Sequence, residues 1–225
     1  MRAKDKIKHV LLEENPVALH RRKQLRKALT NQSPTFLCPN CIGGLLFHDL
    51  GLQFNSPTVN LMMFQTDFAK FVLDLDGYLS QKLDFFKHPE YDFPCAHLGD
   101  ITLHFTHYHT EEEAAGKWAE RAARIDKENL FVFLEERDGL GREDILRLGG
   151  IHARGLVVFT ANKYPDIPYA VQIPKYAPDG EVVIFWRYPI LTANGSTSAT
   201  LTLSVGLIRP MEIMMCLRLL SEAAT

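Results

Sequence analysis

Short apolar stretches alternate along this chain with longer segments in which apolar residues recur every three or four positions. The short stretches predict strands, and the longer segments predict helices that bury one face. Strands are predicted at Thr35–Cys38, Val59–Phe64, Ile101–Phe105, Leu130–Leu134, Gly155–Thr160, Tyr169–Ile173 and Val182–Trp186.

The best-marked helix follows Thr110, which forms a capping-box pattern with Glu113. Its apolar stripe includes Trp118, and the charged residues are expected on the opposite, solvated face. Further helices are predicted between Phe68 and Leu79 and over the basic segment Leu19–Leu29.

Strands that alternate with helices predict an α/β fold with three layers, in which a mostly parallel sheet carries helices on both faces. This arrangement is Rossmann-like, but the chain has no GxGxxG dinucleotide-binding fingerprint. We divide the chain into a basic helix and linker over 1–34, an α/β domain over 35–192, and a separate tail over 193–225.

Composition narrows the function classes only slightly. A net charge of −2 gives no reason to expect nucleic-acid binding, and the apolar runs are too short to cross a bilayer. Four cysteines without an apolar export signal suggest reduced thiols in a cytoplasmic protein. The basic helix leaves peripheral contact with an anionic membrane open, although a helix docked on the protein surface is the stronger alternative.

Ligands of parallel α/β sheets bind beyond the carboxyl ends of the strands, so the loops after the strands are the expected site. Glycines at a strand-to-helix turn let the backbone approach an anion, and the helix N-terminus offers N–H groups. The alternative is that the glycines only allow a tight turn. The turn after the first strand contains Asn40, Cys41, Gly43 and Gly44.

The third predicted strand supplies histidines. Asp100 and His104 share one face of that strand because side chains alternate, and His107 follows its end. A histidine there could act as a general base or stabilise a leaving group, with Asp100 as a third candidate catalytic residue. The alternative is a hydrogen-bonded structural histidine.

Other loops and one helix face add polar candidates. Acidic residues after the fourth strand could bind a divalent metal or act as a base, and the basic helix stripe could hold phosphate. A charged surface is the plainer interpretation of both patterns. These candidates are Glu135, Glu136 and Asp138, Thr160 and Asn162, and Lys117, Arg121 and Arg124.

Cys38 and Cys41 form a CxxC pattern at the first strand-to-helix turn. Thiol oxidoreductases place their cysteines at such a turn, so a redox function is a second alternative. The same two thiols with His104 and His107 could instead bind zinc.

Several segments together resemble a bacterial domain family of unknown function whose members are often described as exopolysaccharide biosynthesis proteins. The resemblance implies the fold and the cellular setting, but it does not imply a particular reaction. It also adds Ser56 and Thr58 to the candidate substrate contacts. It rests on Asn40–Gly44, Ser56–Val59, Asp100–Tyr108, Glu113–Ile125, Asn129–Val132 and Phe159–Thr160.

The resemblance stops after Thr192. Methionine has a single codon, so a one-base shift makes Met211-Glu212 encode glycine and Met214-Met215 encode aspartate. With ordinary codons for the other residues, the shifted reading frame encodes a sequence rich in aromatic and acidic residues, as expected for the family. We therefore interpret 193–225 as a frameshifted tail; the alternative is a strand over Thr197–Val205 and a terminal helix.

These patterns together predict a cytoplasmic protein of exopolysaccharide or capsule synthesis. It would transfer a sugar or related group from an activated nucleotide-sugar donor. A carbohydrate-binding or assembly protein without chemistry is the alternative. The sequence does not define a cofactor or an oligomeric state.

Overall fold

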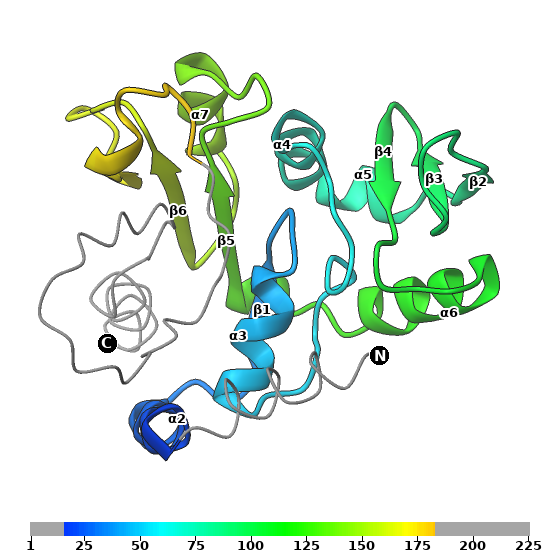
Figure 1. The fold of residues 1–225 in the computed structure, drawn as a ribbon, viewed down its shortest axis with the longest axis horizontal. Helices are drawn as coiled ribbons and strands as arrows, with labels where there is room; N and C mark the ends of the chain where they lie inside the picture. The colour runs from blue at the N-terminus through cyan, green and yellow to red at the C-terminus, as the bar shows by residue number, and fades with distance from the viewer. Residues whose placement is uncertain (1–15, 183–225) are drawn as a thin grey trace, which may run out of the picture.

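The computed structural model describes residues 16–182, and it contains two sheets. A four-stranded sheet and a three-stranded sheet lie on either side of helix α4, Gln65–Leu73, which contacts strands of both (Figure 1). The larger sheet carries the loops that the sequence marks as a site.

The larger sheet is fully parallel, in the order β1-β5-β6-β7. Its strands confirm four of the predicted stretches, at slightly different boundaries. They are β1, Thr35–Leu37; β5, Leu130–Glu135; β6, Gly155–Thr160; and β7, Ala170–Gln172.

Alternate residues of β5 enter two different apolar cores. Leu130, Val132 and Leu134 belong to one core, whereas Phe131 and Phe133 belong to the other. This alternation follows from strand geometry, in which successive side chains point to opposite faces. A central strand that is buried on both faces therefore reads as a continuous apolar run.

Helices cover both faces of the parallel sheet. Helices α4 and α7, Arg142–Leu148, contribute to the first core, and α3, Ile42–Leu50, contributes to the second. The three-layer α/β fold predicted from the alternation of strands and helices is thus confirmed.

The smaller sheet is an antiparallel meander that the sequence analysis did not separate from the larger one. It consists of β2, Asp84–Phe86; β3, Cys95–Leu98; and β4, Ile101–His104. The expectation that Ile101–Phe105 joins the parallel sheet is therefore wrong. A two-residue turn, with Gly99 at a φ of 63°, returns the chain directly into β4.

The predicted strand Val59–Phe64 is also wrong. Only Met62 pairs, through an isolated bridge to His104, and Asn60 takes a φ of 68° that interrupts any strand. The Met63 N–H donates to the Pro39 carbonyl at 2.8 Å. This segment thus connects the end of β4 to the turn after β1.

Helix α6, Glu111–Ala122, begins as its capping pattern predicts. The Thr110 hydroxyl accepts the Glu113 N–H at 3.1 Å, while the Glu113 carboxylate accepts the N–H of His109 instead of Thr110. The remaining elements are α2, Pro16–Ala28; α5, Leu75–Leu79; and the 3₁₀ turns Lys127–Asn129 and Pro174–Tyr176.

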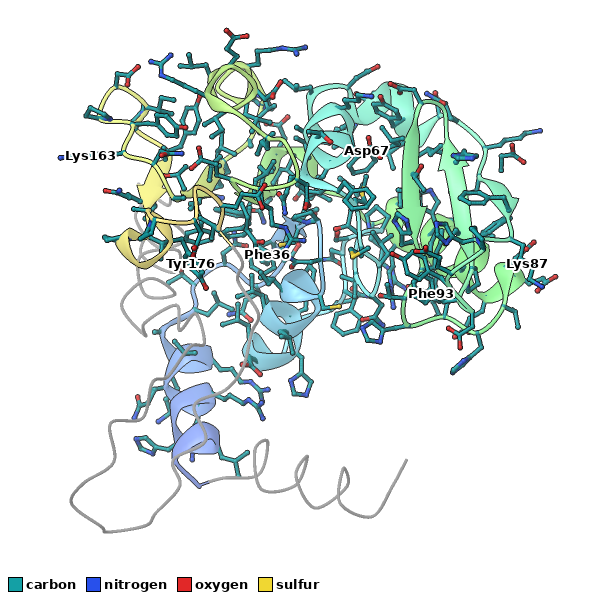
Figure 2. The ribbon with its side chains drawn as sticks, turned by 45° about the horizontal axis from the view of Figure 1, so that its top comes forward. Phe36, Asp67, Lys87, Phe93, Lys163 and Tyr176 are labelled. Atoms are coloured by element: carbon teal, nitrogen blue, oxygen red, sulfur yellow. The ribbon has the colours of Figure 1, made fainter. Side chains whose placement is uncertain are left out.

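Within residues 16–182 no helix is long and apolar enough to cross a membrane. The suspected frameshifted tail and nearly all of the predicted strand Val182–Trp186 lie outside the described residues. Figure 2 shows Lys87, which follows β2, and Lys163, which follows β6, at opposite ends of the molecule, with Phe36 between them.

Candidate functional site

The turns after β1 and β5 meet at the carboxyl edge of the parallel sheet. The Asn40 amide donates to a Glu135 carboxylate oxygen at 3.2 Å, although the two residues are 95 positions apart. Arg137 Nη1 lies 3.6 Å from the other Glu135 oxygen. Because Glu135 is buried, these contacts hold a carboxylate at the sheet edge.

The turn after β1 also meets the loop after β4. Cys41 Sγ lies 3.1 Å from His107 Nε2, at the start of α3. The imidazole of His107 is exposed and the thiol of Cys41 is partly exposed, so the pair is open to solvent. The sequence analysis grouped these two residues as possible zinc ligands at the edge of one sheet, whereas in the structure their contact joins turns of two different sheets.

The surroundings of Cys41 keep its thiol protonated. Burial raises the pKa of Cys41 above its ordinary value, and hydrogen bonds from its own backbone and from the Thr106 hydroxyl offset this only in part. In the absence of ligand, therefore, the pair is a neutral thiol next to an imidazole.

Gly43 and Gly44 allow α3 to approach β1 and the segment after Thr58. A methyl group at Gly43 would lie 3.3 Å from Cys38 Sγ, and one at Gly44 would lie 3.4 Å from Val59 Cγ1 and Asn60 Oδ1. Gly43 is therefore packed tightly against Cys38, whereas a methyl group at Gly44 would make ordinary van der Waals contacts. Their N–H groups still lie in the first turn of α3, where a helix has no carbonyl to receive them.

Glu136, the neighbour of Glu135, holds the loop after β6 in place. Its carboxylate accepts the N–H groups of Ala161, at 2.7 Å, and Asn162, at 3.0 Å, and also the side chains of Asn162 and Tyr164. The Thr160 hydroxyl donates to the Asn162 carbonyl at 2.8 Å. The contacts of Thr160 and Asn162 thus stabilise this loop.

We expect Glu136 to make stability depend on acid pH. Burial raises its pKa, but the donated hydrogen bonds outweigh burial and hold the folded-state pKa below the ordinary value. Its contribution is therefore complete above the unfolded pKa of about 4.3 and is lost as the pH falls through the folded pKa. The free energy of unfolding, measured with urea, should fall below about pH 5 more steeply in the wild type than in Glu136→Gln.

The same substitution should lower the free energy of unfolding by about 2–3 kcal/mol at pH 7, because it replaces an acceptor oxygen with an NH2 group that turns a donor toward existing donors. Glu128→Gln, at an exposed position, should change it by less than about 0.5 kcal/mol. An equal acid dependence in wild type and Glu136→Gln would contradict the assignment.

Asp138 and Gln65 support the end of β5. The Gln65 amide oxygen accepts the Glu135 N–H at 3.0 Å, and its own N–H donates to Asp138 at 3.4 Å. The Arg137 guanidinium also contacts Asp138, at 3.2 Å. Gln65 was not among the predicted residues, since it fell between a predicted strand that ends at Phe64 and a predicted helix that begins at Phe68.

His104 is buried among aromatic rings and does not contact the Cys41–His107 pair. Its ring packs edge-on against Phe64 and Tyr91, at centroid distances of 5.5 and 5.7 Å. Burial lowers its pKa, so the ring is neutral at pH 7. His88 and Phe93 stack on either side of Tyr91 and complete the aromatic cluster.

Asp100 does not lie at the predicted site. It occupies the turn before β4, at the opposite end of that strand from His104. Lys70 pairs with it at 2.7 Å, and the Tyr78 hydroxyl donates to it at 2.6 Å. The predicted catalytic role fails for this residue because its contacts fix the hairpin to α4 and α5.

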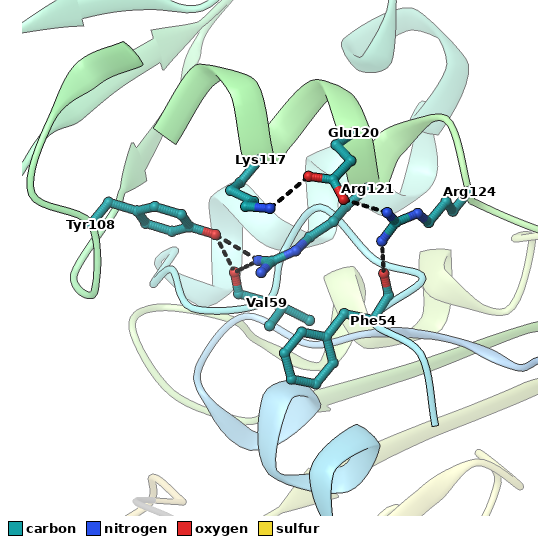
Figure 3. Close-up of polar contacts among 7 residues, drawn as sticks. All are labelled: Phe54, Val59, Tyr108, Lys117, Glu120, Arg121 and Arg124. Atoms are coloured by element: carbon teal, nitrogen blue, oxygen red, sulfur yellow. Dashed lines mark hydrogen bonds and ion pairs between the residues drawn. The ribbon is translucent and has the colours of Figure 1, made fainter. Parts of the chain in front are cut away.

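The expected solvated stripe on α6 is also wrong, because Arg121 is buried. As Figure 3 shows, it donates to the Val59 carbonyl at 2.9 Å and to the Tyr108 hydroxyl at 2.6 Å. Arg124 donates to the Phe54 carbonyl and pairs with Glu120. Both arginines therefore hold the segment 54–59 in place.

Ser56 and Thr58 are buried inside this segment. Their hydroxyls lie 3.0 Å apart, and the Thr58 oxygen accepts the Cys38 N–H at 3.3 Å. Together these hydroxyls hold the C-terminal end of β1 in place. Because β1 leads into the turn that carries Cys41, they also help to position that turn.

The two thiols of the CxxC pattern are not joined in a disulfide, and their surroundings differ. Cys38 lies in the second apolar core, whereas Cys41 faces His107. Among the residues that the structure describes, no three His, Cys, Asp or Glu side chains form a group that could hold a metal ion.

Away from the sheet edge, α2 docks on the C-terminal end of α3. Arg22 pairs with Asp49 at 2.8 Å, and Arg26 donates to the His48 and Asp49 carbonyls at 3.0 Å each. Cations favour a helix C-terminus, so this basic helix has a structural partner. A hollow of about 560 Å³ lies between the two helices.

Comparison with known proteins places the chain in a family. The sequence model of the family described as "Domain of unknown function (DUF1919)" matches residues 14–201. The chain belongs to this family. DUF1919 thus covers the parallel sheet, the hairpin sheet and both turns that meet at Cys41 and His107.

A relative from Haemophilus influenzae, described as "Uncharacterized protein", is 37% identical over 160 residues. The match covers 71% of this chain and 77% of the relative. The fold is therefore shared over most of both proteins, and the relative offers a second chain for tests of ligand binding.

Proposed function

We propose that the protein is a cytoplasmic enzyme of surface-polysaccharide assembly that transfers a sugar or related group from an activated donor. The observation that carries this proposal is the meeting of three loops at the carboxyl edge of the parallel sheet. Asn40 contacts Glu135, and Cys41 contacts His107. The resemblance to exopolysaccharide biosynthesis proteins supports the cellular setting.

Each group at this edge suits one part of a transfer reaction. The N–H groups in the first turn of α3 would meet a diphosphate, as helix N-termini commonly do. The exposed imidazole of His107 would remove a proton from the acceptor hydroxyl. The buried carboxylate of Glu135 would keep Asn40, and with it the turn, in place.

A second candidate function is carbohydrate binding without chemistry, favoured by the aromatic cluster of Phe64, His88, Tyr91 and Phe93. Phe64 is 46% exposed, so part of its ring is open to a ligand beside the other aromatic rings. Aromatic faces offer an apolar surface for the C–H groups of a sugar ring.

Thermal unfolding with and without ligand separates the two functions. With uridine diphosphate at about 100 times its Kd, a transferase should gain about 2.7 kcal/mol, which corresponds to roughly 5–10 °C in Tm. Asn40→Ala should reduce this gain, because it releases the Ile42 N–H and Glu135. His48→Gln, near the other end of α3, is the matched control and should retain it.

The Haemophilus relative should be tested in parallel with a panel of nucleotide sugars. Stabilisation by free sugars alone would favour the binding protein. Absence of any nucleotide effect in both proteins would contradict the transferase.

A further inference from the structure

Cys41 and His107 have the geometry of a nucleophile and its base. The 3.1 Å between Sγ and Nε2 lies within hydrogen-bond reach, and both groups are open to solvent. Neither residue supports the core, unlike Cys38 and His104, which are buried. A contact between two reactive side chains at the sheet edge therefore requires a chemical explanation.

We propose that Cys41 is a nucleophile, activated by His107, that accepts an acyl group from an activated acyl donor and passes it to a sugar hydroxyl. The acceptor rests on the function proposed above, and the inference identifies the transferred group as an acyl group. The acyl group is carried on the enzyme as a thioester of Cys41.

The reaction balances without an oxidant or reductant. His107 Nε2 takes the thiol proton, Cys41 Sγ bonds to the acyl carbon, and the donor's leaving group departs with that proton. An acceptor hydroxyl then gives its proton to His107 and attacks the thioester. The new carbon–oxygen bond forms, the carbon–sulfur bond breaks, and the proton returns to Cys41.

The start of α3 would stabilise both negative charges that develop in this reaction, on the sulfur of Cys41 and on the oxygen of the tetrahedral intermediate. Cys41 immediately precedes the helix, where the positive end of the dipole favours a thiolate. The N–H groups of Gly43 and Gly44, in the first turn, would stabilise the negative oxygen of the tetrahedral intermediate. Asn40 Oδ1 accepts the Ile42 N–H at 3.0 Å and fixes the turn that presents the thiol.

The resting protonation state fits a general-base mechanism. Since burial raises the pKa of Cys41, the thiol is neutral until a substrate arrives, and His107 must remove its proton during attack. The thiol of a redox-active CxxC or a zinc site would instead have a lowered pKa. The acylation rate should therefore depend strongly on the imidazole.

The test measures acylation of the full chain by p-nitrophenyl acetate, in a Cys216→Ser background, with the adduct located by mass spectrometry. We expect one adduct, on Cys41, since Cys38 and Cys95 are buried. His107→Gln should slow its formation by about 100-fold at pH 7. His109→Gln, an exposed histidine in the same loop, should change the rate by less than about twofold.

The pH profile separates catalysis from a structural contact. In the wild type His107 should supply the base at neutral pH, whereas in His107→Gln the acylation rate should rise only at alkaline pH, as the thiol ionises. Cys41→Ala should abolish the adduct while Tm stays within a few degrees. Equal acylation rates in wild type and His107→Gln, or an adduct elsewhere, would overturn the inference.

The two proposals can fail separately. If Cys41 is acylated but nucleotides do not stabilise the protein, the inference is supported and the nucleotide-sugar donor of the proposed function is contradicted. If nucleotides stabilise the protein but acylation does not depend on His107, the inference is overturned and the proposed transferase function remains supported.

Discussion

Phe36→Ala should lower the free energy of unfolding by about 3–5 kcal/mol, the largest effect expected of any substitution considered for this chain. Phe36 is fully buried in β1, and its ring lies 4.9 Å from Phe47 and 6.0 Å from Phe131. Alanine would leave a cavity where the edge strand joins α3, and the surrounding helix and sheet could close it only in part.

Urea unfolding followed by circular dichroism would measure this loss. Phe36→Leu keeps most of the volume and should cost about 1–2 kcal/mol. Phe64→Ala makes the same chemical change at a position that is 46% exposed, and it should cost less than about 1 kcal/mol. Equal losses at the two phenylalanines would contradict the described core.

Arg121→Met should cost about 2–3 kcal/mol and lower Tm by roughly 4–12 °C. Methionine fills much of the space but loses the hydrogen bonds to Val59 and Tyr108 and the contact of the guanidinium with the Phe54 ring, whose centroid lies 5.3 Å away. The segment 54–59 would then lose its attachment to α6.

Lys117→Met is the matched control, because Lys117 pairs with Glu120 at the surface and should contribute less than about 1 kcal/mol. A double-mutant cycle with Tyr108→Phe should show a coupling of about 1 kcal/mol with Arg121 and almost none with Lys117. An Arg121→Met protein as stable as Lys117→Met would show that the buried network contributes nothing.

Sequence patterns predicted the parallel sheet well because β1 and β5 are buried throughout and β6 is buried over its last four residues, although β7 is only half-buried. Gly155–Thr160 and Leu130–Leu134 are uninterrupted apolar runs between turns, so their length and boundaries were visible. They failed for Val59–Phe64, which is largely apolar but forms an irregular segment that Asn60 interrupts and that ends at the exposed Phe64. Hydrophobicity reports burial, and a strand also requires a partner.

The hairpin β3–β4 carried a signal that was missed. Gly99-Asp100 stands between two apolar stretches, and a two-residue loop of this type usually joins antiparallel strands. Recognising it would have removed β4 from the parallel sheet and Asp100 from the site.

The candidate site was predicted in part. Asn40 and Glu135 follow strands of one parallel sheet, so their meeting follows from topology. Cys41 and His107 belong to turns of different sheets, so their meeting depends on how the two sheets pack together, which the sequence pattern does not report. Arg121 was misplaced because a charged residue next to an apolar stripe was assumed to face solvent.

The position of β1 at the edge of the parallel sheet has a consequence for synthesis of the protein. Among the strands of residues 16–182, β1 pairs with β5 alone, and the Asn40–Glu135 contact spans 95 residues of chain. The segment that carries Cys41 therefore emerges from the ribosome long before its partner strand exists. Until β5 has been translated, that thiol remains outside the native fold and exposed to oxidation or to a chaperone.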